Sequence, residues 1–217
     1  LENKSDEKTY MFSIQSGAVN GVDCDPLFAT EVAPGKKSKN DINFMDNVLV
    51  NNGIIEFTDI EMTFKVYDSN DWTADPVALE TVHVYPYGEE KATTFMRESQ
   101  STDTVLFDDG NVSVIVIGYT NDQVWGYTVS LYLANKTDKT LMYSVDEASV
   151  NGYMADPFWS KEVQPGKVAF TSMSWFDTTL EENDIIEVEE IEMLFKVYDS
   201  NDWMADKLIE KTVTLKP

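Results

Sequence analysis

The most regular pattern in the chain is an apolar residue at every second position, and it occurs twice. Ile, Met, Phe and Val alternate with Glu, Thr and Lys over residues 60–66, and residues 191–197 alternate in the same way. Such alternation places all the apolar side chains on one face of a β-strand. Each stretch continues into Asp-Ser-Asn-Asp-Trp, a cluster of turn-forming residues. We therefore predict, at both places, a core strand that leads into a tight polar turn.

The two stretches belong to a repeat of domain length. A shift of 131 positions, from Lys8 to Lys139, aligns residues 8–86 with residues 139–217 without a gap, and about half of the aligned residues are identical. A period this long indicates tandem domains rather than a solenoid. Residues 1–6 match residues 133–138, so the first copy lacks counterparts of residues 111–132. We expect residues upstream of Leu1 to supply these strands and any export signal or lipid anchor.

The second copy contains further alternating stretches. In residues 125–133, Trp125, Tyr127 and Val129 are followed at the same spacing by two leucines, which predicts a strand with these side chains on one face. About seven short strands, with turn signals every 8–12 residues, are typical of an antiparallel β-sandwich. No amphipathic helix of three turns is present, which argues against α/β enzyme folds. We predict one domain over residues 1–86, a polar linker over 87–103, and a second domain over 104–217.

Several short motifs of the second copy resemble those of a known family. They are Leu-Ala-Asn-Lys-Thr-Asp-Lys-Thr-Leu at 133–141, Val-Asn-Gly at 150–152, Val-Gln-Pro-Gly-Lys at 163–167 and Leu-Phe-Lys-Val-Tyr at 194–198. The chain resembles the immunoglobulin-like domains of unknown function found in bacterial lipoproteins and secreted proteins. The resemblance implies an all-β fold of two tandem immunoglobulin-like antiparallel β-sandwich domains, the first without its N-terminal strands. It also implies an extracytoplasmic protein, secreted or lipid-anchored at the cell surface, and it carries over no activity and no functional residues.

Charge and composition exclude several classes of partner. The net charge is −23 and the isoelectric point is about 4.1, so the chain repels nucleic acid and anionic lipid. No run of 18 apolar residues is present, so we expect no membrane span. The single cysteine, Cys24, permits no intramolecular disulfide. The single histidine, His83, provides too little for a zinc site or a histidine-dependent triad.

The two acidic turns are candidate calcium sites. Calcium binds six to eight hard oxygen atoms, which closely spaced carboxylates and carbonyls on a loop can supply. The spacing differs from that of an EF-hand, and the alternative is a turn in which the first aspartate and the asparagine cap backbone N–H groups. The candidate ligands are Asp68, Asn70, Asp71 and Asp75 in the first copy and Asp199, Asn201, Asp202 and Asp206 in the second.

Exposed aromatic residues are candidates for stacking against sugar rings, because an aromatic face offers apolar area beside a polar rim. The four candidates are Trp72, Trp203, Trp159 and Tyr153. The alternative is that Trp159 and Trp203 are half-buried plugs at the ends of the sandwiches. The first copy has Phe28 in place of Trp159 and Val22 in place of Tyr153, which weakens the case for a platform shared by both copies.

No residue pattern marks a catalytic site. Acidic pairs such as Glu181-Glu182 and Glu189-Glu190 fall on predicted turns or strand ends, and no apolar pocket for a general acid is indicated. We therefore predict a non-catalytic binding or spacer module without a cofactor other than calcium, which binds an unknown protein or glycan. The alternative is a carbohydrate-binding accessory module of a larger polysaccharide-degrading protein. The sheet edge left unpaired in the first copy predicts a homodimer formed through that edge.

Overall fold

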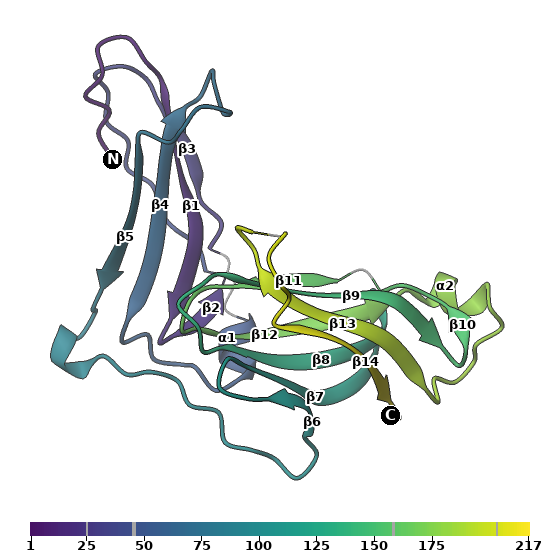
Figure 1. Ribbon diagram of the computed structural model, residues 1–217. Coiled ribbons are helices and arrows are strands. Elements are labelled where there is room, and N and C mark those ends of the chain that lie inside the picture. Colours follow the sequence, from purple (N-terminus) through teal and green to yellow (C-terminus); the bar gives the residue numbers. More distant parts are fainter. Residues whose placement is uncertain (25, 45–46, 158, 203) are drawn as a thin grey trace. The chain divides into compact units, whose positions relative to one another are not determined.

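Strands make up most of the regular structure of the chain. The computed structural model describes residues 1–24, 26–44, 47–157, 159–202 and 204–217 (Figure 1). Strands hold 49% of the residues and helices 6%, so the predicted all-β class is confirmed. The chain divides into two compact units, unit 1 (Leu1–Met96) and unit 2 (Arg97–Pro217).

The strands of unit 1 form one antiparallel arrangement around β1. Its elements are β1 (Tyr10–Val19), β2 (Val22–Cys24), β3 (Ala29–Val32), α1 (Asn47–Asn51), β4 (Ile60–Asp68), β5 (Ala78–Val84) and the 3-10 turn η1 (Glu89–Lys91). β1 pairs with β4 on one side and with β2 and β3 on the other, and β5 pairs with the far side of β4. Asn20 and Gly21 have φ of 51° and 80°, which is the two-residue hairpin turn that an Asn-Gly sequence favours.

Unit 2 contains two antiparallel sheets (Figure 1). Its elements are β6 (Thr104–Asp108), β7 (Val112–Asp122), β8 (Gly126–Asn135), β9 (Leu141–Val150), β10 (Tyr153–Met154), β11 (Ser160–Val163), β12 (Val168–Trp175), α2 (Asp177–Glu181), β13 (Ile191–Asp199) and β14 (Ile209–Leu215). One sheet has the order β12-β8-β7-β6. The other has the order β14-β13-β9, and β9 pairs on its far side with β10 and β11.

The two sheets of unit 2 share one apolar core, so this unit is a β-sandwich. Val114 and Leu131 from the first sheet and Leu141 and Phe195 from the second are fully buried in the same cluster. Because successive side chains of a strand point to opposite faces, each strand contributes only alternate residues to this core. Trp175 is also buried, and its indole Nε1 donates a hydrogen bond to the Ala155 carbonyl oxygen at 2.7 Å. The core therefore holds a large polar aromatic ring with its N–H satisfied.

The repeated segments form the same strand pairs in both units. Tyr10 lies opposite Asp68 in unit 1, and Leu141 lies opposite Asp199 in unit 2. The outer pairs match as well, because β4 meets β5 in the register in which β13 meets β14. The alternation in residues 60–66 and 191–197 therefore specifies the predicted strand at both places. Its apolar face is buried in unit 2, whereas in unit 1 Met62 is the one buried residue of β4.

The stretch predicted as a linker, residues 87–103, makes contacts within both units. In unit 1 the Thr93 N–H donates to the Thr58 hydroxyl at 3.0 Å, and the Phe95 N–H donates to the Asn20 carbonyl at 2.7 Å. In unit 2 the Arg97 guanidinium donates two hydrogen bonds of 2.6 Å to the Asp103 carboxylate. The unit boundary therefore falls between Met96 and Arg97, inside this stretch.

We expect the Arg97–Asp103 pair to make unit 2 sensitive to acid. Both side chains are largely buried. The two hydrogen bonds from the Arg97 guanidinium and the one from the Gln100 N–H lower the pKa of Asp103. A carboxyl group whose pKa is lower in the folded than in the unfolded chain stabilises the fold above its unfolded pKa of about 3.9 and loses that contribution as the pH falls through its folded pKa. We expect Asp103→Asn to lower the stability of unit 2 at pH 6. The variant should then lose less stability than the original chain when the pH falls below about 4.

Urea unfolding followed at pH 6 and at pH 3 checks this expectation. The exposed Asp41→Asn variant is the control and should keep the acid sensitivity of the original chain. An Asp103→Asn variant that loses as much stability between the two pH values as the original chain would show that the pair is not responsible.

Within the described ranges, no helix is long and apolar enough to cross a membrane.

Candidate functional site

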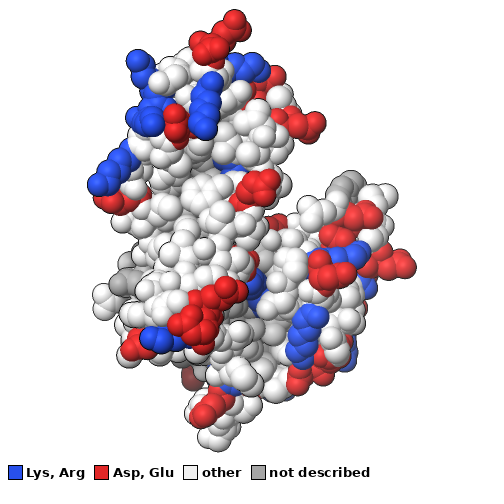
Figure 2. Space-filling view, turned by 90° about the vertical axis from the view of Figure 1, so that its left-hand side faces the viewer, with Lys and Arg blue, Asp and Glu red and all other residues white. Residues whose placement is uncertain are grey.

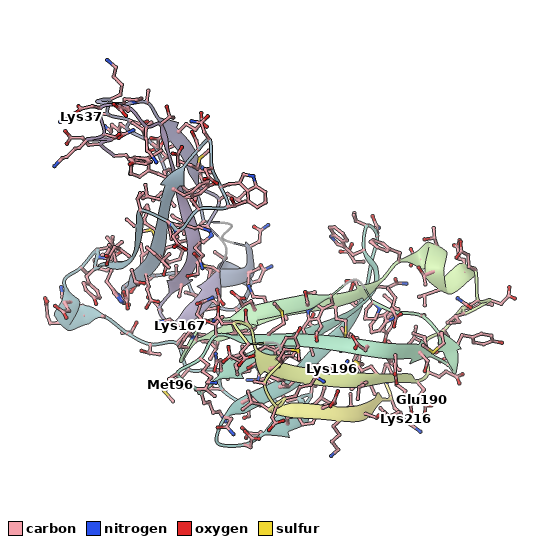
Figure 3. All side chains as sticks on the ribbon, turned by 45° about the horizontal axis from the view of Figure 1, so that its top comes forward. Lys37, Met96, Lys167, Glu190, Lys196 and Lys216 are labelled. Carbon is pink, nitrogen blue, oxygen red and sulfur yellow. The ribbon has the colours of Figure 1, made fainter. Side chains whose placement is uncertain are left out.

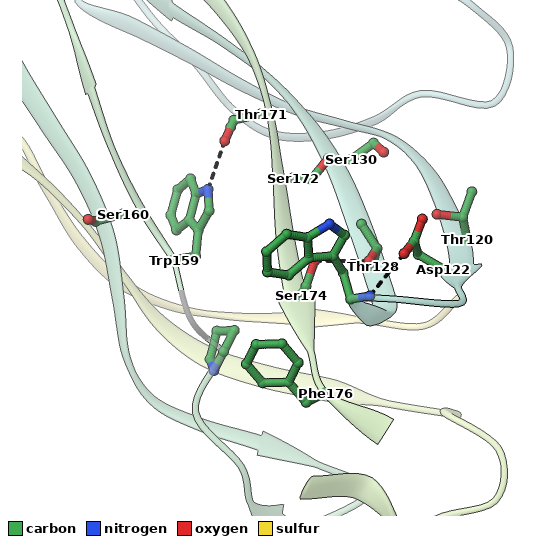
Figure 4. A pocket seen from close by; sticks show the side chains of 12 residues that line it. Thr120, Asp122, Thr128, Ser130, Trp159, Ser160, Thr171, Ser172, Ser174 and Phe176 are labelled. Atoms are coloured by element: carbon green, nitrogen blue, oxygen red, sulfur yellow. Dashed lines mark hydrogen bonds between the residues drawn. The ribbon is translucent and has the colours of Figure 1, made fainter. Parts of the chain in front are cut away.

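The first sheet of unit 2 carries a groove lined by hydroxyl groups and aromatic rings. It has a volume of about 730 Å³, and we call it the hydroxyl groove (Figure 4). Its lining residues are Thr120, Asp122, Trp125, Thr128, Ser130, Pro157, Trp159, Ser160, Thr171, Ser172, Ser174 and Phe176. All of them belong to unit 2, so the groove is a feature of that sandwich alone.

Strand register places the hydroxyl groups in two rows across the sheet. Ser174 on β12 lies opposite Thr128 on β8, and Thr128 lies opposite Thr120 on β7. In the next row Ser172 lies opposite Ser130. Directly opposite residues in neighbouring antiparallel strands share a face, so these side chains stand together on the face away from the core. The Thr128 and Ser174 hydroxyls are 2.9 Å apart and share a hydrogen bond.

Two aromatic rings lie at one end of these rows. The rings of Trp125 and Phe176 have centroids 6.1 Å apart and are inclined by 36°. Trp125 is 54% exposed and Phe176 is 40% exposed, so both rings offer apolar surface to solvent. Both rings line the groove together with Thr128 and Ser174 (Figure 4).

The turn before β8 fixes the position of Trp125. The Asp122 carboxylate accepts hydrogen bonds from the backbone N–H groups of Val124 (2.8 Å) and Trp125 (2.9 Å), and these donors lower the pKa of Asp122. Gly126 then has φ of 74°, a conformation that favours glycine. The prediction that Trp125 shares a face with Tyr127 and Val129 is therefore wrong, because β8 begins at Gly126 and the turn directs Trp125 to solvent.

Trp159 connects the groove to the core. Its ring centroid is 5.8 Å from that of buried Phe195, and its indole Nε1 donates to the Thr171 hydroxyl at 3.1 Å. The ring is half-buried and also lines the hydroxyl groove. Trp159 is therefore half-buried, as the alternative of a plug at the end of the sandwich expected, and it also lines the groove, so its stacking against a sugar stays a prediction.

The other predicted sugar-stacking residues lie elsewhere. Tyr153 is 55% exposed on β10 and does not line the hydroxyl groove. Trp72 is 77% exposed in the turn after β4 of unit 1. Trp203 lies outside the described residues. The sequence did not lead us to Trp125, Phe176 or the hydroxyl rows. The rows could have been recognised from Ser or Thr at alternate positions, at 128 and 130 and at 172 and 174.

The predicted calcium turns use their first aspartate for backbone capping and an ion pair. Asp68 accepts a hydrogen bond from the Asn70 N–H (3.0 Å) and pairs with the Lys8 ammonium at 3.0 Å. In unit 2, Asp199 accepts from the Asn201 N–H (3.0 Å) and pairs with Lys139 at 2.9 Å. The Asn70 N–H and Lys8 lower the pKa of Asp68, and Lys139 and the Asn201 N–H lower that of Asp199.

The remaining candidate ligands do not complete a metal site among the described residues. Asp71 accepts a hydrogen bond from the Thr73 hydroxyl at 2.8 Å, and Asp75, Asp202 and Asp206 are exposed. In the part of the chain that the structure describes, no three His, Cys, Asp or Glu side chains are grouped closely enough to hold a metal ion. Calcium binding at these turns stays a prediction.

The outer face of the second sheet of unit 2 differs from that of the first. There Lys196 on β13 pairs with Asp146 on β9, and Lys216 pairs with Glu190 at 3.2 Å just beyond the ends of β14 and β13 (Figure 3). Exposed ion pairs of this kind contribute little to stability and keep the sheet hydrated.

A second hollow of about 800 Å³ lies around α2. Its floor includes Leu180 and Ile185, and its rim carries Asp177, Glu181 and Asp184. Its described lining is more acidic than that of the hydroxyl groove, whose one acidic residue is Asp122, and it lacks a pair of exposed aromatic rings. The hydroxyl groove is the stronger candidate site.

Comparison with known proteins found no protein-family model, no curated protein and no solved structure that matches the chain.

Proposed function

We propose that the protein is a non-catalytic binding module, built as two tandem immunoglobulin-like β-sandwich domains, whose hydroxyl groove binds a neutral glycan. The observation that carries this proposal is the combination, on one sheet face, of ordered hydroxyl rows with the exposed rings of Trp125 and Phe176.

The chemistry of the groove matches that of a sugar. A serine or threonine hydroxyl can both donate and accept a hydrogen bond, and so can every hydroxyl of a sugar. The hydroxyls of Thr120, Ser130 and Ser172 can therefore pair with a polyhydroxylated ligand in several hydrogen-bond directions, whereas the buried Thr128 hydroxyl already bonds the Gly126 carbonyl and Ser174. The apolar faces of sugar rings can pack on the rings of Trp125 and Phe176, which lie at the end of these rows.

Charge favours a neutral ligand over an anionic one. None of the described residues lining the groove is lysine or arginine, and Asp122 contributes a negative charge. Over the face shown in Figure 2, acidic side chains are interspersed with basic ones, and the chain as a whole carries a net charge of −23. Phosphorylated or acidic ligands would be repelled by this field.

The ionisation of the acidic residues supports a role without catalysis. Glycoside hydrolysis requires one carboxyl group whose pKa is raised so that it can act as a general acid. At seven of the described acidic residues the structure displaces the pKa downward: Asp68, Asp103, Asp108, Asp109, Asp122, Asp199 and Glu210. These groups are held as carboxylates by N–H, hydroxyl and lysine or arginine donors.

We place the protein outside the cytoplasm, secreted or lipid-anchored at the surface of a bacterium. Polysaccharides are encountered there, and the family resemblance of the motifs at 133–141 and 163–167 supports the same location. The glycan-binding role is also compatible with an accessory module of a larger polysaccharide-degrading protein.

Aromatic substitutions in the groove test the function. We expect Trp125→Ala and Phe176→Ala each to weaken binding to a neutral polysaccharide by about fivefold, because each removes a stacking contribution of about 1 kcal/mol. The measurement is gel retardation across a panel of soluble neutral polysaccharides, followed by calorimetry on the one that binds.

Trp72→Ala is the matched control, since Trp72 is an exposed tryptophan of unit 1 outside the groove. It should bind as the original chain does. Equal losses for Trp72→Ala and Trp125→Ala, or no retardation by any polysaccharide of the panel, would contradict the proposed function.

A further inference from the structure

Asp122 is the one ionised side chain among the described residues that line the hydroxyl groove. Its two hydrogen bonds, from the backbone N–H groups of Val124 and Trp125, both end on the Oδ1 atom. Among the described residues no group donates to the second oxygen, Oδ2, and Asp122 is exposed. Oδ2 is therefore available to accept a hydrogen bond from a ligand in the groove.

The turn between β7 and β8 holds this oxygen in place. The two N–H donors, at 2.8 and 2.9 Å, fix the orientation of the carboxylate, so Oδ2 needs little further ordering when a ligand binds. On β7, Asp122 follows Thr120 on the same outer face, and it lies opposite Gly126, the residue after Trp125 (Figure 4). The ordered oxygen therefore lies where the hydroxyl rows end and the turn that carries Trp125 begins.

The charge of Asp122 gives this contact a direction. The Trp125 and Val124 N–H groups lower the pKa of Asp122, so the side chain is a carboxylate at neutral pH. No lysine or arginine is found among the described residues of the groove, so the protein does not neutralise this charge there. A carboxylate accepts hydrogen bonds and cannot donate one, whereas serine and threonine hydroxyls do both. Asp122 therefore requires a donor at this point of the ligand.

We propose that Asp122 is a specificity-determining residue of the hydroxyl groove: it admits sugars that present a free hydroxyl to Oδ2, and it rejects uronic acids. This role rests on the proposed glycan-binding function of the groove. A sugar hydroxyl beside Trp125 donates to Oδ2 in a charge-assisted hydrogen bond. A uronic acid in the same place brings a second carboxylate towards Oδ2, and the two like charges repel each other.

Ionic strength separates this local effect from the net charge of the chain. The net charge of −23 is spread over the whole chain, and at 0.15 M salt its effect is screened beyond a Debye length of about 8 Å. Asp122 acts within hydrogen-bond distance of the ligand, where such screening is weak. At this ionic strength the choice between a neutral and an acidic sugar therefore depends on Asp122 more than on distant acidic residues.

Asp122→Asn tests this role, because asparagine keeps an oxygen that can accept from the two turn N–H groups and removes the charge. The two ligands are a soluble neutral glucan, mannan or galactan that the original chain binds, and the same polymer with its primary hydroxyls oxidised to carboxylates. Calorimetry at 0.15 M salt gives the ratio of the two affinities. We expect the original chain to prefer the neutral polymer by at least about tenfold and Asp122→Asn by only about twofold. Binding of the neutral polymer should weaken by about fivefold in the variant, because a neutral hydrogen bond replaces a charge-assisted one.

Asp138→Asn is the matched control, since it removes the same charge from an exposed residue of unit 2 outside the groove. It should keep the ratio of the original chain. An equal fall in the ratio for Asp138→Asn and Asp122→Asn would assign the selection to the net charge and overturn the proposal.

The remaining outcomes separate this role from the function on which it rests. A ratio that Asp122→Asn leaves unchanged, with the neutral polymer still bound by the original chain, would overturn the role of Asp122 and leave the proposed function standing. An equal loss of both ligands, with the indole N–H signal of Trp125 displaced, would make Asp122 only a positioning residue of the turn and would also overturn the role. Failure of glucan, mannan and galactan alike to bind the original chain would overturn it as well, and failure of every neutral polysaccharide would contradict the proposed function too.

Discussion

Replacing Phe195 by alanine is expected to lower the free energy of unfolding of unit 2 by about 3–5 kcal/mol. Phe195 is fully buried, and its ring packs between Phe107 and Trp159 with centroid distances of 5.6 and 5.8 Å. Removing the ring loses its burial and leaves a cavity between two sheets that cannot close without moving their strands. Denaturant unfolding, with amide exchange to resolve unit 2, measures the loss.

Phe64→Ala is the matched substitution in unit 1, because Phe64 occupies the equivalent position of the repeat. Its ring is partly exposed and makes an edge contact with Phe28 at 6.3 Å, so we expect a loss of only about 1–2 kcal/mol from unit 1. Equal losses at Phe64 and Phe195 would contradict the difference between an open face in unit 1 and a closed core in unit 2.

Gly126→Ala is expected to destabilise unit 2 by more than about 2 kcal/mol and to abolish binding in the groove. A methyl group at this position would lie 2.2 Å from the Trp175 carbonyl oxygen, and the backbone has φ of 74°. Both β8 and the end of β12 would have to move, and Trp125 and Phe176 lie directly beside them. Thermal unfolding and polysaccharide binding measure the two effects.

Gly118→Ala serves as the control, since an added methyl group there meets no atom within 4 Å and Gly118 lies in the neighbouring strand β7. Its stability should change by less than about 1 kcal/mol. A Gly126→Ala variant as stable as Gly118→Ala, with polysaccharide binding intact, would show that the turn does not hold Trp125 in place.

The strands and the repeat could be predicted from the sequence because burial on one face imposes a period of two. The alternation at residues 60–66 and 191–197 sets which side chains enter the core, and the turns at Asn20-Gly21 and Asn151-Gly152 need the positive φ that Asn-Gly supplies. Sequence reasoning therefore reached the all-β class and the core strands from local patterns alone.

The candidate site could not be found in the same way because it depends on contacts between strands. Ser172 and Ser130 are 42 residues apart (172 − 130) and become neighbours only through the register of β12 with β8. Trp125 continues the period of two in the sequence. However, Gly126 has a left-handed backbone conformation and is the first residue of β8, so Trp125 lies outside the strand. The pattern predicted that Trp125 shares a face with Tyr127 and Val129, but the backbone conformation of Gly126 turns Trp125 away from that face.

The most direct test of the glycan-binding groove is an NMR titration that follows the indole N–H signals of the five tryptophans with soluble neutral gluco-, manno-, galacto- and xylo-oligosaccharides. One of these ligands should shift the signals of Trp125 and Trp159 together and leave those of exposed Trp72 and buried Trp175 in place. Shifts confined to Trp72, or no shift at Trp125 with any ligand of the set, would contradict the account.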